Sequence, residues 1–417
     1  MKMITGVLFF FATFSTFVSA DEKHDWRIWR GPNRNGIANV KDRVPISWNA
    51  ATNIRWKAAV PGRGHSSPIV VGDQVILTTA DESQHIQSVI SFDRTTGKQL
   101  WKTDVNQGGF TNRVHAKNTH ASPTVASNGK TLFAAFNHHG AVHLVSLDLK
   151  GKMLWQKNLG AFQPQAYSFG YAPSPALYKS LVIIAAEVET NGYLAAFDQA
   201  TGGEVWRTPR LGCITHSSPI VANVSGRDQL LISGCQKVSS YAPSTGRQLW
   251  SAAGASKETC GTMVWDGGIV FASGGYPKKE TAAVRADGSG TVLWNNTTAC
   301  FEQSMLAYKG YLYAVDDNGI AYCWEGKTGR RTWRTRLGGK VSSSPILAGE
   351  NIYLTNEQGT TYVFRAHPEK FELVAKNQLG DEGFATPAIC DDVIFLRTAN
   401  QSSGTRRETL YCIGVFK

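Results

Sequence analysis

The sequence GKQLW runs from Gly97 to Trp101, and close copies of it recur along the chain. In every copy a glycine stands four residues before a tryptophan. The pairs are Gly97 and Trp101, Gly151 and Trp155, Gly202 and Trp206, Gly246 and Trp250, Gly290 and Trp294, and Gly329 and Trp333. Glycine adopts the positive φ that tight turns need, and tryptophan buries a large apolar ring. The constant offset therefore predicts one turn followed by one buried indole in each unit of a repeat.

A second motif marks where each unit begins. It reads Ser-Ser-Pro or a close variant and precedes a short apolar strand. The starts lie at Ser66, Ala121, Pro173, Ser217, Gly261, Gln303, Ser343 and Ala385. Each unit then holds short β-type segments separated by turn residues, with no helical periodicity. Units of four strands, repeated eight times, predict an all-β, eight-bladed β-propeller.

The ring needs a closing strand, because the eighth unit stops soon after its third strand, Leu410 to Phe416. The segment Asn53 to Val60 contains Trp56 and matches the Trp-bearing fourth strands of the other units. We expect it to pair beside the last strand, since an open ring would expose a long sheet edge. Trp56 thus joins the other six as a structural blade tryptophan. The seventh unit departs from the pattern, with Ala375 where tryptophan is expected.

The chain ahead of the ring divides into two parts. Residues 1–20 have the form of a secretory signal peptide: Lys2, an apolar run from Val7 to Phe14, and a small-residue cleavage site that ends at Ala20. The apolar run is too short to span a bilayer. We therefore expect residues 21–52 to be a lead-in segment, residues 53–417 to be a single propeller domain, and the protein to be periplasmic or secreted, with no membrane span.

Charge and cysteine content narrow the partners. The net charge of +11 reflects basic residues spread along the chain, and only Lys327 to Lys340 is dense. This excess serves solubility or binds an acidic polymer, and no nucleic-acid partner is expected. Seven cysteines include no Cys-x-x-Cys pair, so a zinc ribbon has no support. In an oxidising compartment a disulfide between Cys213 and Cys235 is possible.

With both motifs in view, the chain resembles the pyrroloquinoline-quinone-like (PQQ-like) repeat propellers. This family includes quinoprotein alcohol dehydrogenases and the outer-membrane assembly lipoprotein BamB, and the resemblance covers Asn53 to Lys417. The segment Trp29 to Gly36, WRGPNRNG, looks like the lead-in of secreted planctomycete-type members. The motifs are specific for the fold and say little about activity.

The resemblance implies a cofactor site that these residues do not reproduce. Quinoprotein dehydrogenases stack PQQ on a disulfide between adjacent cysteines beside a calcium ion, and no two cysteines are adjacent here. The cofactor is therefore unknown, and PQQ is not expected. BamB is lipid-anchored, and no cysteine follows the predicted cleavage site at Ala20.

Ligand sites of propellers tend to lie where loops surround the central channel on one face, here called the top face. This face receives the loops from each fourth strand to the next blade and those between second and third strands. The spacing of the unit starts shows that the loops 106–119 and 160–172 are enlarged. They carry aromatic residues that either form a stacking platform or fold inward as small loop cores: Phe110, Phe162, Tyr167, Phe169 and Tyr171.

One position in the repeat concentrates reactive side chains. Three residues before the Pro or Met of the unit starts stand His65, His120, Ala172, His216, Cys260, Glu302, Ser342 and Phe384. Equivalent positions lie at one height around a ring, so His65, His120, His216, Cys260 and Glu302 are predicted to rim the channel. The residue types suit a ligand or a metal, and we favour a small-molecule ligand because a wide ring separates the side chains. The alternative is that each side chain caps its own loop.

No catalytic motif is found in the sequence, neither a nucleophilic triad nor a phosphate loop. The favoured function is a non-enzymatic binding or scaffold protein of the cell envelope, with an envelope protein or a small-molecule or glycan ligand as partner. The alternatives are a quinone- or ligand-dependent oxidoreductase and a protein that binds acidic polysaccharide.

Overall fold

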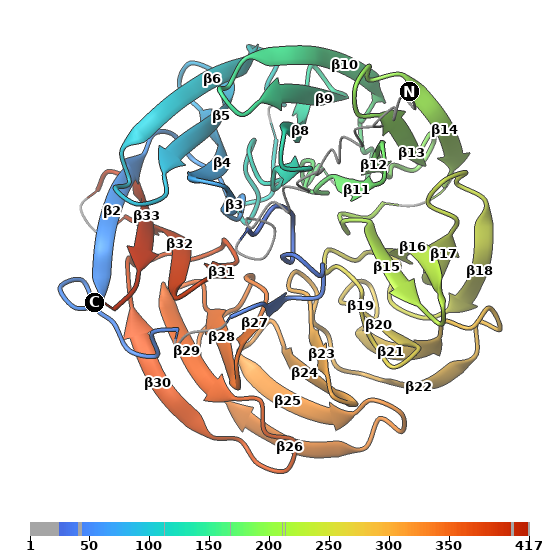
Figure 1. Ribbon diagram of the computed structural model, residues 1–417. Coiled ribbons are helices and arrows are strands. Elements are labelled where there is room, and N and C mark those ends of the chain that lie inside the picture. The colour runs from blue at the N-terminus through green and yellow to red at the C-terminus, as the bar shows by residue number, and fades with distance from the viewer. Residues whose placement is uncertain are drawn as a thin grey trace, which may run out of the picture.

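The computed structural model describes residues 25–40, 44–111, 113–166, 168–210, 212, 214–401 and 404–415. These residues form strands, turns and loops, and among them no helix is long and apolar enough to cross a membrane. Eight sheets stand around a central axis, each built from successive antiparallel strands (Figure 1). The predicted eight-bladed all-β propeller is confirmed.

The first four blades follow one another along the chain. Blade 1 contains β3 (Ile69–Val71), β4 (Gln74–Asp81), β5 (Ile86–Asp93) and β6 (Gln99–Gln107). Blade 2 contains β7 (Ala126–Ser127), β8 (Thr131–His138), β9 (Ala141–Asp148) and β10 (Met153–Ala161). Blade 3 contains β11 (Ala176–Tyr178), β12 (Leu181–Ala186), β13 (Tyr193–Asp198) and β14 (Glu204–Pro209). Blade 4 contains β15 (Ile220–Val224), β16 (Arg227–Gly234), β17 (Lys237–Tyr241) and β18 (Gln248–Ala253).

Two of the last four blades, blades 7 and 8, also contain a strand from the N-terminal part of the chain. Blade 5 contains β19 (Val264–Asp266), β20 (Ile269–Gly274), β21 (Glu280–Arg285) and β22 (Val292–Asn296). Blade 6 contains β23 (Leu306–Tyr308), β24 (Tyr311–Val315), β25 (Ile320–Glu325) and β26 (Arg331–Arg336). Blade 7 contains β27 (Ile346–Ala348), β28 (Asn351–Thr355), β29 (Thr360–Arg365) and β30 (Leu373–Gln378), with β1 (Ile37–Ala38) added in parallel to β27. Blade 8 contains β31 (Ala388–Cys390), β32 (Val393–Asn400), β33 (Arg407–Ile413) and the closing strand β2 (Ile54–Val60).

Ring closure follows the sequence prediction. Strand β2 pairs antiparallel with β33, and Trp56 lies opposite Cys412. In Figure 1 the blue β2 therefore lies beside the red β33 at the outer edge of the ring. Pairing the two ends of the propeller gives blade 8 its fourth strand and covers an edge that would otherwise be exposed.

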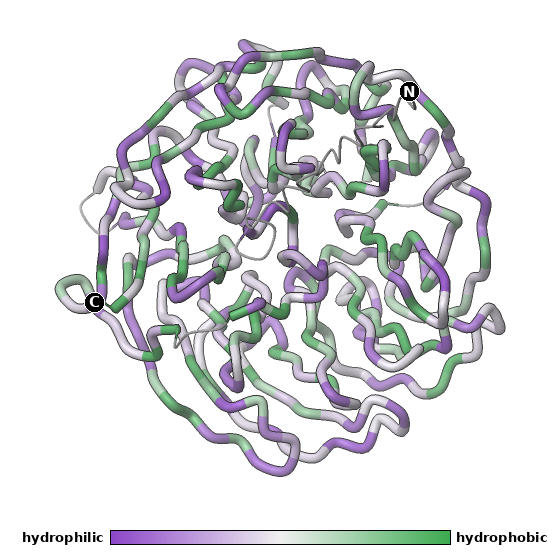
Figure 2. The backbone as a smooth tube through the Cα atoms, viewed as in Figure 1, coloured by the Kyte–Doolittle hydropathy of each residue, from purple (hydrophilic) through white to green (hydrophobic). Residues whose placement is uncertain are grey.

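The hydrophobic core lies between neighbouring blades. One cluster, for example, joins Phe133 and Val142 of blade 2 to Val182 and Ile184 of blade 3. In Figure 2 apolar residues recur along the strands of every blade, whereas many turns are hydrophilic. Since each blade buries its faces against the two beside it, the ring gains stability only when it is complete.

The blade tryptophans join each sheet to the next. The indole N–H donates to a backbone carbonyl in a turn of the following blade at 2.8–3.1 Å for Trp56, Trp101, Trp155, Trp206, Trp294 and Trp333. The constant spacing of four residues between the glycine and the tryptophan of each repeat has a steric reason. Gly151 has φ +83°, and a Cβ there would lie 2.6 Å from the ring of Trp101 in the preceding blade. The glycine therefore provides both the turn and the space for the neighbour's indole.

Trp250 uses an intermediate side chain. Its indole N–H donates to Oε1 of Gln229 at 2.7 Å, and Nε2 of Gln229 donates to the Ala286 carbonyl of blade 5 at 2.8 Å. Ala286 occupies the turn that other blades present directly to the indole. The joint between blades 4 and 5 is thus preserved through Gln229.

The lead-in segment crosses the channel. Trp26 pairs with Val70 of blade 1, and the Arg27 carbonyl accepts from the Ser127 N–H of blade 2. Arg34 donates to carbonyls of blades 3 and 4, and the buried Arg30 donates to the Met305 and Pro345 carbonyls of blades 6 and 7 at 2.6 and 3.0 Å. Figure 1 shows this dark blue segment in the middle of the ring. The segment therefore fills one end of the channel and links the inner strands of most blades.

Candidate functional site

A circle of hydroxyl groups surrounds the channel where the inner strands begin. In seven of the eight blades the backbone N–H of the hydroxyl residue donates to the side-chain oxygen of its counterpart in the next blade at 2.9–3.0 Å. The members are Ser67, Thr124, Ser174, Ser218, Thr262, Ser304, Ser344 and Thr386. Thr262 instead accepts the indole N–H of Trp29 at 2.8 Å. We call this set the hydroxyl circle.

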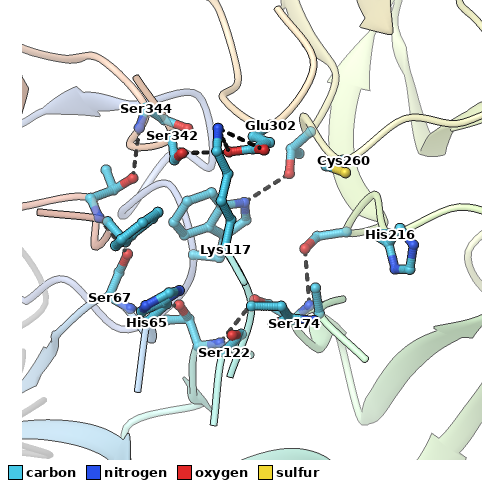
Figure 3. Close-up of a pocket in the computed structure, with 18 of the residues that line it drawn as sticks. His65, Ser67, Lys117, Ser122, Ser174, His216, Cys260, Glu302, Ser342 and Ser344 are labelled. Atoms are coloured by element: carbon cyan, nitrogen blue, oxygen red, sulfur yellow. Dashed lines mark hydrogen bonds and ion pairs between the residues drawn. The ribbon is translucent and has the colours of Figure 1, made fainter. Parts of the chain in front are cut away.

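A cavity of about 210 Å³ lies above the hydroxyl circle, at the top face. Seven members of the circle line it, all except Ser304, together with Trp29 from the lead-in. The cavity therefore has a walled base inside the channel. Figure 3 shows its labelled residues arranged around the axis, with Lys117 among them.

The predicted rim position lines this cavity in every blade once the register is read from the sheets. The lining includes His65, Ala172, His216, Cys260, Glu302, Ser342 and Phe384, and in blade 2 it includes Ser122. His120 is not among the lining residues and stacks on Phe110 with ring centroids 4.0 Å apart. This corrects the predicted rim in one blade.

The reason is a shift of two residues in blade 2. Ile69 pairs with Ile76 in blade 1, and the equivalent pair in blade 2 is Ala126 with Phe133. Thr124 therefore takes the place of Ser67, and Ser122 takes the place of His65. Alignment on Pro123 places His120 at the rim, but the hydrophobic pairing of the strand determines which residue reaches the channel.

The two enlarged loops meet over the cavity. The Asn118 side chain donates to the Phe169 carbonyl at 2.7 Å, and the ring of His115 meets the ring of Phe169 edge-on at 5.0 Å. Both His115 and Phe169 line the cavity. Loop 106–119, from blade 1, is thus held against loop 160–172, from blade 2.

Lys117 connects the first loop to the far side of the channel. Its ammonium lies 3.1 Å from Glu302 and 2.8 Å from Glu357. The Ser342 hydroxyl lies within hydrogen-bond distance of both carboxylates and has one proton to donate to either of them. Figure 3 shows Lys117 extending toward Glu302 and Ser342. This group was not identified from the sequence, although Lys117 lies in a loop whose enlargement is visible in the repeat spacing.

The remaining ionisable rim groups are held in uncharged forms. Burial, together with the nearby His115, lowers the pKa of His216 to about 4. Burial also lowers the pKa of His65 well below its ordinary value, assisted by the charges of Arg63, Arg397 and Arg406. Burial, with Glu302 and Glu258 nearby, raises the pKa of the Cys260 thiol. At neutral pH the rim therefore presents neutral imidazoles and a thiol.

The aromatic residues of the enlarged loops divide between the two predicted roles. Phe162 and Tyr171 are buried against one another with ring centroids 5.2 Å apart, and the Tyr171 hydroxyl donates to the Ala185 carbonyl. Phe110 lies between His85 and His120. Phe169 lines the cavity, and Tyr167 lies outside the described residues. Most of the predicted platform is therefore loop core.

The cysteines are mostly isolated. Cys260, Cys300, Cys323, Cys390 and Cys412 are free thiols. Cys213 lies outside the described residues, so its pairing with Cys235 stays a prediction. Within the part of the chain that the structure describes, no three His, Cys, Asp or Glu side chains are grouped so that they could hold a metal ion.

The family comparison gives a consistent result. The family model described as outer membrane protein assembly factor BamB matches residues 37–187, 190–304 and 278–368. The BamB of Burkholderia pseudomallei (strain K96243) is 24% identical over 321 residues, which are 74% of this chain and 66% of that protein. Quinohemoprotein alcohol dehydrogenase of Comamonas testosteroni is 28% identical over 174 residues, which are 41% of this chain and 22% of that enzyme. The aligned part is less than two thirds of each relative's own length.

Solved structures share the fold. BamB from Moraxella catarrhalis superimposes with a TM-score of 0.63 at 13% identity and covers 87% of this chain and 97% of its own. A europium-containing methanol dehydrogenase superimposes with a TM-score of 0.68 at 11% identity and covers 95% of this chain and 99% of its own. At such identities the superpositions show the propeller architecture and leave the function to be argued from the site.

Proposed function

Since the chain belongs to the family described as outer membrane protein assembly factor BamB, we propose that it is a non-enzymatic binding scaffold of the cell envelope. In this proposal the protein is periplasmic or secreted after removal of residues 1–20. An envelope protein is bound by the exposed loops, and a small ligand is bound in the cavity at the top of the channel.

The observation that carries the proposal is the state of the groups around the cavity. His65 and His216 are neutral, and the Cys260 thiol is protonated at neutral pH. Glu302 is engaged by Lys117 and Ser342. A general base or nucleophile needs a partner that activates it within hydrogen-bond reach. An imidazole whose pKa is this low is a weak base and a protonated thiol is a poor nucleophile, so these groups suit binding better than catalysis.

A quinone-dependent oxidoreductase is the main alternative, and the cavity does not suit that cofactor. PQQ carries three carboxylates, whereas among the described residues the lysine that lines the cavity, Lys117, is paired with two carboxylates of the protein. Burying further negative charge beside Glu302 would be costly without a new cation. The cysteines of the sequence also include no adjacent pair on which the quinone could stack.

Binding of acidic polysaccharide would use another surface. The dense basic segment contributes β26, the outer strand of blade 6, where Arg331, Arg334 and Arg336 are exposed. Arg330 lies 3.5 Å from Glu325, so part of this charge is compensated. Exposed charges of this kind interact weakly at physiological salt, and they favour the solubility interpretation.

Photo-crosslinking tests the scaffold proposal. A photoreactive residue at Gln84, exposed in the β4–β5 turn of the top face, is compared with one at Ser225 in the β15–β16 turn of the opposite face. We expect Gln84 in the full chain, expressed in its own cells, to crosslink one defined envelope protein, and Ser225 to give none. In parallel, purified protein is incubated with PQQ, calcium and an alcohol. Alcohol-dependent reduction of a dye, with no crosslink from either position, would contradict the proposal.

A further inference from the structure

The hydroxyl circle leaves a set of hydrogen-bond donors around the cavity. A hydroxyl group can accept two hydrogen bonds and donate one. In the circle one acceptor site is used by the N–H of the preceding blade. Among the described residues no acceptor is recorded for the hydroxyl protons of Ser67, Thr124, Ser174, Ser218, Ser344 and Thr386. These protons can therefore be donated to a ligand.

The histidines add polar atoms that lack partners. His216 is only 5% exposed, and among the described residues neither ring nitrogen makes a hydrogen bond of good geometry, although the Gly170 backbone is close enough to raise its pKa slightly. Nε2 of His65 is also buried and makes no hydrogen bond among the described residues. A buried polar atom without a partner is destabilising, so such atoms in a cavity wall indicate a missing partner. A neutral imidazole offers one donor and one acceptor.

The other walls of the cavity are aromatic. Phe169, Phe301, Phe384 and Trp29 all line it. Phe384 is stacked on His65 with ring centroids 4.2 Å apart and an interplanar angle of 10°, which holds both rings in place. Aromatic faces bind the apolar faces of flat or ring-shaped ligands. The walls thus combine stacking surfaces with hydroxyl and imidazole groups.

The charge of the cavity selects against ions. Lys117 is paired with both Glu302 and Glu357, and burial raises the pKa of Glu302, which reduces the negative charge of this group. A ligand carboxylate would approach these two carboxylates, and a ligand ammonium would compete with Lys117 and lose its hydration. The volume of about 210 Å³ is below the range of about 300–1,000 Å³ for drug-sized ligands. A cavity of this size suits a single small ring.

We infer that the cavity binds one neutral, hydroxylated ring, namely an uncharged sugar unit, either free or at the end of a glycan. The hydroxyl circle bonds the sugar hydroxyls, the imidazole rings of His65 and His216 line the site, and the aromatic walls contact the C–H faces of the sugar. The inference rests on the proposed function because it assigns a ligand class to the same cavity.

Calorimetric titration of the full chain tests the ligand class. The probes are D-glucose, D-galactose and N-acetyl-D-glucosamine, with D-glucuronic acid and D-glucosamine as charged counterparts. We expect saturable binding of at least one neutral sugar, and at least about tenfold weaker binding of the charged ones, because each tenfold step needs only about 1.4 kcal/mol. No saturation by any neutral sugar up to about 10 mM overturns the inference, as does equal binding of the charged sugars.

Two variants place the sugar in the cavity. Ala172→Leu extends a side chain into the cavity and removes no polar partner, and Phe169→Ala removes one aromatic wall. Both should weaken sugar binding about tenfold or more. The matched control is Ala200→Leu, at an exposed position in the β13–β14 turn of the opposite face, which should bind as the native protein does. Unchanged binding in both cavity variants, with native melting temperatures, overturns the inference.

The two proposals can fail separately. If the Gln84 crosslink forms but no neutral sugar binds, the scaffold proposal stands and the ligand class is wrong. If a neutral sugar binds in the cavity but no envelope protein crosslinks, the ligand class stands and the scaffold proposal is wrong.

Discussion

The seam between blades 2 and 3 and the seam between blades 7 and 8 are filled by different parts of the chain. At the first, Trp155 of β10 packs on Phe133 of its own blade and donates to the Gln199 carbonyl of blade 3. At the second, β30 has Ala375 at the position equivalent to Trp155, opposite Val363. The ring beside it belongs to Trp48 of the lead-in, which stacks on Tyr353 with ring centroids 6.4 Å apart.

Tyr353 is the register equivalent of Phe133, so Trp48 meets the same partner as a blade tryptophan but approaches from outside the blade. Asn377 of β30 holds the lead-in there. Its Oδ1 accepts a hydrogen bond from the backbone N–H of Trp48 at 2.9 Å, and its Nδ2 donates to the Ile46 carbonyl at 3.0 Å. Trp48 is 3% exposed. The lead-in therefore supplies the buried indole that β30 lacks.

Strand β30 lacks the tryptophan, and blade 8 lacks the turn on which that tryptophan would dock. Elsewhere the indole docks on the turn between the third and fourth strands of the next blade. In blade 8 these strands are β33 and β2, which come from opposite ends of the propeller, so no such turn exists. A tryptophan at 375 would have no turn carbonyl to bond. The irregular residue thus reflects the way the ring closes.

The largest expected effect comes from removing the segment that makes the second seam. Deletion of residues 21–60 takes away the channel-filling lead-in, Trp48 and the closing strand β2. We expect aggregation, or a loss of most of the unfolding free energy, because the edge of β33 becomes exposed. Size-exclusion chromatography and thermal unfolding measure this. A monomeric truncation with an unchanged melting temperature would show that the seam does not need the segment.

At the regular seam, Trp155→Ala should lower the free energy of unfolding by about 3–5 kcal/mol. This is the usual cost of emptying a large aromatic site. The substitution also leaves the Gln199 carbonyl without its indole donor. Denaturant unfolding gives the value. A loss below about 1 kcal/mol would mean that the blade tryptophans contribute little to the stability of the ring.

Trp48→Ala should cost less than Trp155→Ala in the same measurement. Both remove a buried indole, but Nε1 of Trp48 has no hydrogen-bond partner among the described residues. We expect a loss of about 2–4 kcal/mol, from packing alone. If Trp48→Ala lowered the free energy of unfolding as much as Trp155→Ala, the hydrogen bond from Trp155 to the next blade would add no measurable stability.

The smallest effect is expected at the seam between blades 4 and 5. Gln229→Leu keeps most of the side-chain volume but breaks the link from Trp250 to Ala286. Leaving the buried indole N–H unpaired should cost about 1–3 kcal/mol. Gln358→Leu, near the top-face surface of blade 7, is a control for the loss of an amide. Equal stability of the Gln229 variant and the native protein would show that the relay is dispensable.

Much of the fold follows from short-range patterns. The offset of four residues between glycine and tryptophan predicts the blades, because both residues serve the same inter-blade joint. Trp56 identifies the closing strand for the same reason. Trp48 could not be found in this way, since no local pattern shows that a residue of the lead-in will replace one missing from β30.

The site was less accessible from the sequence. His65, His216, Cys260 and Glu302 line the cavity as their shared repeat position suggests, whereas His120 does not. In blade 2 the Ser-Pro pair stands two residues earlier relative to the strand register, and alignment on proline cannot reveal this. Lys117 depends on a loop that crosses the channel. Such a contact is set by the three-dimensional path of the loop and has no periodic signature.

The pairing of β2 with β33 also has a kinetic consequence. The two strands are separated by the whole propeller, so their contact is among the most distant in sequence that this fold can form. Contacts of large sequence separation slow folding, because the loop entropy is lost before the pairing is gained. Until β33 has folded, β2 has no strand to pair with and the lead-in has only part of the channel wall to contact. Unfinished molecules therefore expose a sheet edge and the open channel, and this interval is when the protein is most prone to aggregate and most dependent on protection by other factors.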